Sequence, residues 1–360
     1  MLFDNVAVII PAYKPDEKLL VTLNSVIGEG FSKILVVDDG SGEEFENIFT
    51  QVKTIPECTL LRHKVNRGKG AALKTAFTYA LDNMSDLSGV VTADADGQHL
   101  ANDIKKVSEE MIKKDKVILG VRDFSSADVP ARSKSGNIIT SAVFRIFFGM
   151  KVSDTQTGLR AFPLKYIAKI AEADGDRYEF ETNMLFLINK AGIPMGEVKI
   201  STVYIEENKS SHFRVVRDSI RIYGLIIKYL LSAVGALIID YLVFHFLNFY
   251  RVFSFLPIFP TIMPQVVARV ISSVFNYFVN AKVVFKDHAN KRTLIKYYIL
   301  AAVQLAVGFG GVALLCSLLN IENKWLQDAI YLLVQVLIYP ISFRIQHKWV
   351  FNEKNRSTAK

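Results

Sequence analysis

Two aspartates separated by one residue, Asp94 and Asp96, directly follow a short apolar run at positions 89–91. Two carboxylates on one extended turn can direct oxygen atoms at a hard divalent cation, and the side-chain carbonyl of Gln98 offers a third oxygen. Such a cation keeps open positions for phosphate oxygens, where it neutralises charge that builds on a departing diphosphate. We therefore predict a Mg²⁺ or Mn²⁺ site at Asp94, Asp96 and Gln98.

The elements that must position these residues alternate between strand and helix from residue 5 to about residue 120. The predicted strands are 6–11, 33–39, 59–63 and 89–96, and the predicted helices are 16–28, 43–52 and 70–81. Strands that are apolar at every position are buried on both faces, which is typical of a parallel sheet covered by helices. In such sheets ligands bind beyond the carboxyl ends of the strands.

Polar residues follow each of the four predicted strands at that carboxyl edge. They are Pro11 and Tyr13, then Asp38, Asp39, Gly40 and Ser41, then residues 67–70, and finally residues 94–99. Asp38 either fixes its own loop by hydrogen bonds or touches the ligand. Gly68 and Gly70 are interpreted as glycines that let the backbone turn tightly into the next helix, because the segment lacks the spacing and the Ser or Thr of a P-loop.

The composition changes after Tyr223, and 51% of the whole chain is hydrophobic. Spans of about 20 mostly apolar residues are long enough to cross a bilayer as helices. The candidate spans are 225–249, 261–281, 296–320 and 327–345. The second half is therefore predicted to be an all-α domain of four transmembrane helices.

The net charge of +8 resides in this apolar half. From residue 225 onward the chain holds 14 Lys and Arg against 5 Asp and Glu, whereas the first 224 residues hold 29 against 30. The cations cluster before the first span, between the second and third, and in the tail, which predicts a multi-pass plasma-membrane protein with the first domain and both termini in the cytoplasm. The basic excess thus indicates membrane topology, and no nucleic-acid partner is predicted.

Two features of the apolar half suggest how its helices are arranged. The segments 274–285 and 340–351 both end in Lys, one residue, Val and Phe at an offset of 66 residues, which suggests two helical hairpins of the same orientation. Alternatively, both segments are simply spans that end in a basic residue beside aromatics. Asp240 and Arg269 fall inside predicted spans, where lone charges are costly, so we predict that they pair.

The soluble half resembles family 2 glycosyltransferases with the GT-A fold, in particular dolichyl-phosphate mannose synthases and bacterial polyprenyl-phosphate glycosyltransferases. The resemblance extends over residues 5–220, and the last 135 or so residues resemble the GtrA-like four-helix membrane family. The segments that carry it are VIIPAYKP, VVDDGS, NRGKGAAL, DADGQH, GVRD, DTQTGLRAF and YEFETNML. It implies a Rossmann-like α/β catalytic domain at 1–205, an interfacial amphipathic segment at 206–224, the membrane domain at 225–351 and a cytoplasmic tail at 352–360.

The resemblance also implies roles for individual residues. Pro11, Tyr13 and Asp39 would contact the nucleoside, while Asp94, Asp96 and Gln98 would hold the metal against the diphosphate. The implied catalytic residues are Asp96, Arg122, Arg132 and Arg214, of which Arg122 would also bind the nucleotide sugar. The implied acceptor-phosphate ligands are Arg132, Arg214 and Lys209. Asp154 is interpreted as a structural residue that orients Arg160, and His99 as a polar residue lining the site.

The implied reaction is transfer of a hexose, with inversion, from a nucleotide sugar to a polyprenyl phosphate such as undecaprenyl or dolichyl phosphate. UDP-glucose is the favoured donor, with UDP-N-acetylglucosamine and GDP-mannose as alternatives. Pro15 stands where the mannose synthase pattern has an acidic residue, which disfavours mannose. The competing functions are a processive polysaccharide synthase, whose QxxRW motif is absent from the sequence, and a lipid-linked-sugar translocase. Related membrane transferases often self-associate, so a homo-oligomer is an open expectation.

Overall fold

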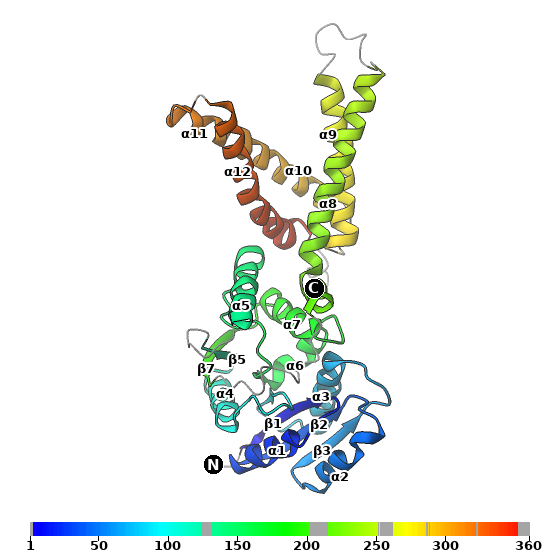
Figure 1. The fold of residues 1–360 in the computed structure, drawn as a ribbon, viewed down its shortest axis with the longest axis vertical. Coiled ribbons are helices and arrows are strands. Elements are labelled where there is room, and N and C mark those ends of the chain that lie inside the picture. The colour runs from blue at the N-terminus through cyan, green and yellow to red at the C-terminus, as the bar shows by residue number, and fades with distance from the viewer. Residues whose placement is uncertain are drawn as a thin grey trace. The chain divides into compact units, whose positions relative to one another are not determined.

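The computed structural model describes residues 3–123, 131–201, 215–250, 252, 262–285, 287, 289–321 and 323–351. The chain divides into two compact units, Met1–Ile222 and Tyr223–Lys360, which are described separately below (Figure 1). Most of the predicted interfacial segment and the predicted tail lie outside the described residues, so the finer domain boundaries stay predictions.

The first unit is built on a seven-stranded sheet. Its strands are β1 (Phe3–Ala12), β2 (Phe31–Asp38), β3 (Cys58–Arg62), β4 (Gly89–Thr92), β5 (Val117–Arg122), β6 (Arg160–Pro163) and β7 (Met195–Ile200). Their order is β3-β2-β1-β4-β6-β5-β7, and only β6 runs antiparallel to its neighbours. The predicted mostly parallel sheet is confirmed, although β5, β6 and β7 were not among the predicted strands.

Helices cover both faces of this sheet. One face carries α1 (Lys18–Gly28), α2 (Glu46–Thr54) and α4 (Ala101–Lys114), and the other carries α3 (Lys69–Asn83), α6 (Leu164–Ala171) and α7 (Glu179–Lys190). Along β1, Val8 packs into the core under α1 and α4, while its neighbour Ile9 points to the opposite face and is equally buried. Burial on both faces explains why the strands are apolar at every position.

The second unit is helical. It contains α8 (Val215–Phe249), α9 (Ile262–Val279), α10 (Lys291–Leu305), α11 (Val312–Leu318) and α12 (Lys324–Ile345), and a π-helical turn joins α10 to α11. Among the described residues, two helices are long and apolar enough to cross a membrane, Gly224–Phe249 and Lys291–Leu318. α9 and α12 coincide with the other two predicted spans, and the number of spans stays a prediction.

The two copies of the internal repeat share a local structure, while the predicted common orientation of the hairpins stays a prediction. α9 ends in a π-helical turn at Asn280–Val284 and α12 in one at Gln346–Val350, again 66 residues apart. Equivalent residues of the two copies contact each other: Asn280 Nδ2 donates to Gln346 Oε1 at 3.1 Å, and the rings of Phe285 and Phe351 stack at 5.1 Å. Such contacts between equivalent residues are expected when two similar hairpins meet around a local two-fold axis.

The predicted ion pair between α8 and α9 is also confirmed. Arg269 Nη2 lies 3.3 Å from Asp240 Oδ2, and Ser272 Oγ donates to Asp240 Oδ1 at 3.1 Å. The Asp240 side chain is only 17% exposed, whereas that of Arg269 is 65% exposed. The Asp240 carboxylate is therefore satisfied within the helix pair.

Candidate active site

The two aspartates of the predicted metal site lie just beyond the carboxyl end of β4. Thr92 Oγ1, the last side chain of the strand, donates to the Gly158 carbonyl at 2.8 Å and fixes the start of the turn. Both oxygens of the Asp94 carboxylate are engaged, Oδ1 by Lys69 Nζ at 2.7 Å and Oδ2 by His99 Nε2 at 3.2 Å. A Cβ on Gly158 would lie 2.4 Å from Asp94 Oδ2, so only glycine lets the carboxylate occupy this position.

Lys69, the first residue of α3, lies between two carboxylates. Its ammonium is 2.7 Å from Asp94 Oδ1 and 3.0 Å from Glu181 Oε2, which comes from the first turn of α7. Burial by itself would lower the pKa of Lys69, but the two carboxylates outweigh it and raise that pKa above its usual range. Burial would likewise raise the pKa of Asp94, yet Lys69 and His99 hold it well below its usual range.

Asp96 has a different environment from Asp94. It is half-buried and accepts a hydrogen bond from the backbone N–H of Gln98 at 3.1 Å. Burial, together with the neighbouring Asp94 charge, raises the pKa of Asp96 above its ordinary value. A carboxylate whose ionised form is disfavoured in this way gains most from an added positive charge, which fits a divalent cation.

The donor set available to a cation consists of oxygen atoms, as Mg²⁺ and Mn²⁺ require. Asp94, Asp96 and Gln98 supply two carboxylates and one amide oxygen on a single turn. Within the part of the chain that is described, no group of three or more His, Cys, Asp and Glu side chains is placed to hold a metal. The remaining positions of a cation here would therefore fall to phosphate oxygens or water.

The acidic loop after β2 is fixed by hydrogen bonds to the segment that follows β3. Asp39 is 2% exposed, and its carboxylate is bound by His63 Nδ1 at 2.7 Å and accepts from the Gly68 backbone N–H at 2.7 Å. The other groups that donate to it are Asn66 Nδ2 and the Arg67 backbone N–H, both at 3.0 Å. Asp39 thus ties its loop to the turn that places Lys69, while its predicted nucleoside contact stays a prediction.

Asp38 fixes its own loop by a hydrogen bond, while a contact of Asp38 with the ligand stays untested. Asp38 Oδ1 accepts from the backbone N–H of Ser41 at 2.9 Å. The Ser41 hydroxyl in turn accepts from the backbone N–H of Lys14 at 2.9 Å, which joins this loop to the one after β1. Pro11 and Tyr13 therefore border the same edge of the sheet as Asp38, as expected from parallel strands.

Arg122, at the end of β5, pairs with Asp154. Arg122 Nε lies 2.7 Å from Asp154 Oδ2 and Nη2 lies 3.1 Å from Oδ1, a two-point contact with a fully buried carboxylate. The interpretation of Asp154 as the residue that orients Arg160 is wrong. Arg160 instead donates to backbone carbonyls, at 2.9 Å to Thr157 and 2.7 Å to Glu181.

The remaining predicted cations lie where the structure does not describe them. Lys209 and Arg214 fall outside the described residues, as does the side chain of Arg132, whose backbone belongs to α5 (Ala131–Val143). Their predicted contacts with sugar and acceptor phosphates stay predictions. Lys69 belongs to the polar residues 67–70 expected at this edge, but neither Lys69 nor Glu181 was assigned a role from the sequence, although both lie in the motifs that carried the resemblance.

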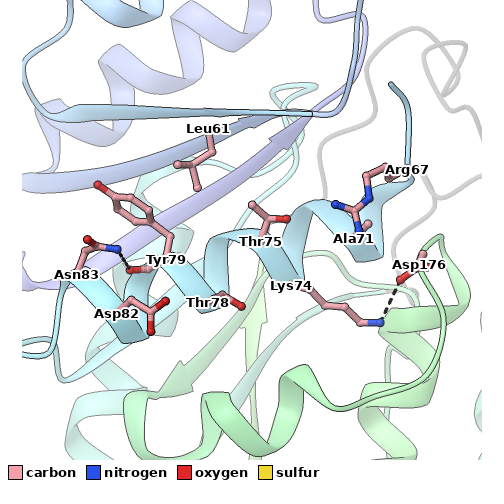
Figure 2. Close-up of a pocket in the computed structure, with 10 residues that line it drawn as sticks. All are labelled: Leu61, Arg67, Ala71, Lys74, Thr75, Thr78, Tyr79, Asp82, Asn83 and Asp176. Carbon is pink, nitrogen blue, oxygen red and sulfur yellow. Dashed lines mark hydrogen bonds and ion pairs between the residues drawn. The ribbon is translucent and has the colours of Figure 1, made fainter. Parts of the chain in front are cut away.

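A separate groove of about 450 Å³ runs along α3. Figure 2 shows the residues that line it, with Lys74 reaching towards Asp176. Lys74 Nζ lies 3.1 Å from Asp176 Oδ1. Neither aspartate of the predicted metal site nor Arg122 lines this groove, so it is distinct from the carboxylate cluster.

The fold of the first unit, a mostly parallel sheet whose carboxyl edge gathers acidic loops, defines a GT-A-type domain. The family model "Glycosyl transferase family 2" matches residues 7–171, and "GtrA/DPMS, transmembrane domain" matches residues 228–351. The chain belongs to family 2 of the glycosyltransferases, with a GtrA/DPMS transmembrane domain as its second half.

Similar proteins come from archaea, eukaryotes and bacteria. An uncharacterised protein of Methanocaldococcus jannaschii is 31% identical over 62% of this chain and 92% of its own length. UDP-N-acetylglucosamine–dolichyl-phosphate N-acetylglucosaminyltransferase of Methanococcus voltae is 30% identical over 55% of this chain and 85% of its own. Dolichyl-phosphate beta-glucosyltransferase of Dictyostelium discoideum is 28% identical over 61% and 74%. Among solved structures, the chain is similar to glucosyl-3-phosphoglycerate synthase from Mycobacterium tuberculosis, crystallised in complex with Mn²⁺, UDP and glucosyl-3-phosphoglycerate. The TM-score is 0.46 and the sequence identity 12%, over 64% of this chain and 80% of that one.

Proposed function

We propose that the chain transfers a hexose from a nucleotide sugar to a polyprenyl phosphate at the cytoplasmic face of the membrane, with inversion at the anomeric carbon. The single observation that carries the proposal is the Asp94–Asp96 pair, held beside Lys69 at the carboxyl edge of a GT-A sheet. Two further facts support the acceptor. The second half of the chain is a GtrA/DPMS transmembrane domain, and the relatives from M. voltae and D. discoideum are named for transfer to dolichyl phosphate.

A phosphate acceptor simplifies the chemistry. Its attacking oxygen is already ionised at neutral pH, so the protein needs to orient two anionic substrates rather than supply a strong base. Arg122, held in one orientation by Asp154, would contact the sugar diphosphate. Asp94, Asp96 and Gln98 would hold Mg²⁺ or Mn²⁺, which neutralises charge on the departing nucleotide when bound.

The donor is proposed to be a UDP-sugar. UDP-glucose is the first choice. UDP-N-acetylglucosamine is the second, supported by the M. voltae relative that is named for it. The D. discoideum relative is named as a glucosyltransferase, which favours glucose. GDP-mannose is placed last because Pro15 replaces the acidic residue of the mannose synthase pattern.

The test is a lipid-extraction assay on membranes that contain the full chain. Each labelled nucleotide sugar is incubated with undecaprenyl or dolichyl phosphate, and the label in the organic phase is counted. We expect a UDP-sugar to label the lipid, and Asp96→Asn to reduce this labelling by about 100-fold or more. Asp86→Asn is the control, because Asp86 is a 70% exposed partner of Lys33 at the surface. Undiminished transfer by Asp96→Asn would refute the mechanism, and absence of lipid product with every donor would refute the function.

A further inference from the structure

The contact between Lys69 and Asp94 places a positive charge of the protein against a predicted metal ligand. Lys69 Nζ lies 2.7 Å from Asp94 Oδ1 and 3.0 Å from Glu181 Oε2, and its side chain is 18% exposed. The other oxygen of Asp94 is bound by His99 Nε2 at 3.2 Å. The protein itself therefore engages both oxygens of the first carboxylate.

Because His99 engages Oδ2, the Asp94 oxygen left for a divalent cation is Oδ1, which the Lys69 ammonium already contacts. Two positive charges a few ångströms apart in a poorly solvated site repel each other strongly, so both cannot bind Oδ1 in this geometry. Asp96 is in a different position. It accepts a hydrogen bond from the backbone N–H of Gln98, and no Lys, Arg or His side chain among the described residues forms a salt bridge with it. A cation can therefore reach Asp96 first.

Glu181 offers Lys69 an alternative partner. Breaking a buried ion pair is costly when it leaves a charge unpaired. Here the ammonium already touches Glu181, whose side chain is 14% exposed, so it can leave Asp94 and remain paired. Lys69 contacts both carboxylates in the structure and would keep Glu181 as its partner after leaving Asp94.

We propose that Lys69 is a positioning residue that competes with the divalent cation for Asp94, and that Glu181 takes up the ammonium when the cation binds. This inference rests on the proposed function, since it concerns the same metal site. It implies that the free enzyme binds the cation weakly and that the nucleotide diphosphate, by adding oxygen ligands, enables the cation to displace Lys69. Metal and nucleotide sugar then enter the site together.

The experiment measures Mn²⁺ binding to the full chain in detergent without nucleotide, from the electron paramagnetic resonance signal of free Mn²⁺. Lys69→Met removes the competitor, and we expect about tenfold tighter Mn²⁺ binding. The matched control is Lys74→Met. Lys74 lies on the same helix about 140° around its axis, is similarly paired with a carboxylate at 3.1 Å, and should leave Mn²⁺ affinity unchanged. Unchanged or weaker Mn²⁺ binding by a folded Lys69→Met variant overturns the proposal.

Glu181→Gln tests the same competition in the opposite direction, because it removes the alternative partner of Lys69. It leaves Asp94 as the carboxylate partner of Lys69, so Mn²⁺ binding should weaken severalfold, whereas Asp176→Asn, the equivalent change at Lys74, should not alter it. In the Lys69→Met background Glu181→Gln should have almost no effect, because no ammonium remains to be shared. An equal weakening in both backgrounds would show a general charge effect and would overturn the proposal.

These outcomes are separate from the test of function. Lys69→Met can fail to tighten Mn²⁺ binding while the wild-type chain still transfers sugar in an Asp96-dependent manner, which refutes the competition alone. If Lys69→Met does not fold, Lys69→Gln takes its place in both comparisons, since it also removes the ammonium charge. For that variant, tighter Mn²⁺ binding supports the proposal, and unchanged or weaker binding refutes it.

Discussion

The pair formed by Arg122 and Asp154 should respond asymmetrically to loss of either partner. The Asp154 carboxylate is fully buried, whereas the Arg122 side chain is 22% exposed and can reach water. Arg122→Met therefore strands a buried negative charge, while Asp154→Asn leaves a cation that can be hydrated and an amide of the same shape. We expect Arg122→Met to be the more destabilising change.

The expected losses of stability follow from the burial of the Asp154 carboxylate. Stranding a buried charge costs about 3–5 kcal/mol, whereas losing a hydrogen bond to a charged group costs about 1.5–3 kcal/mol. For a unit of this size each kcal/mol lowers the Tm by roughly 2–4 °C. The expected decrease is thus about 6–20 °C for Arg122→Met and about 3–12 °C for Asp154→Asn.

Thermal unfolding of the full chain in detergent, followed by intrinsic fluorescence, measures these shifts. The decisive variant combines both substitutions. Asp154→Asn removes the buried charge that Arg122→Met leaves unpaired, so the double variant should have a higher Tm than Arg122→Met alone. Lys169→Met is the control, since it breaks an exposed ion pair with Glu172 and should shift the Tm by about 2 °C or less. Additive losses in the double variant would show that the two side chains are not coupled and would refute the reasoning.

Further variants test three other features of the structure. Gly158→Ala forces the Asp94 carboxylate out of place and should weaken Mn²⁺ binding roughly 10–100-fold, as measured by paramagnetic resonance. Gly68→Ala places a side chain at φ +108° and should destabilise the fold by at least about 1 kcal/mol, seen as a lower Tm. Asp240→Arg and Arg269→Asp should each reduce the monodisperse fraction in size-exclusion chromatography, and the double swap should restore much of it. Equal loss in the double swap would contradict a simple ion pair.

The sheet and its acidic loops could be predicted from the sequence because their signals are local. Strands such as β1 and β2 are buried on both faces, so they appear in the sequence as nearly continuous apolar runs. The parallel arrangement then dictates that residues following these strands meet at one edge. The repeat in the membrane half was also readable, since a fixed offset of 66 residues is a property of the sequence alone.

The partners inside the site could not be predicted, because they depend on segments far apart in the chain. Lys69 and Glu181 are separated by more than one hundred residues and meet only because α3 and α7 cover the same face of the sheet. Asp154 and Arg160 are close in sequence, yet the antiparallel strand β6 carries Arg160 away while Arg122 arrives from β5. Proximity along the chain therefore gave the wrong partner for Asp154.

In the membrane half the buried amides determine how the two hairpins assemble. Gln346 accepts from Asn280 through Oε1 and donates through Nε2 to the Tyr229 hydroxyl at 3.0 Å, so both ends of its amide are satisfied. A buried amide without a partner costs several kcal/mol, so the contact with Asn280 Nδ2 and the Tyr229 hydroxyl favours the register in which Gln346 is satisfied. Apolar side chains cannot specify that register, because lipid tails solvate them as well as a neighbouring helix does. Hydrophobicity thus indicates that these segments are membrane helices, and the polar pair selects their arrangement.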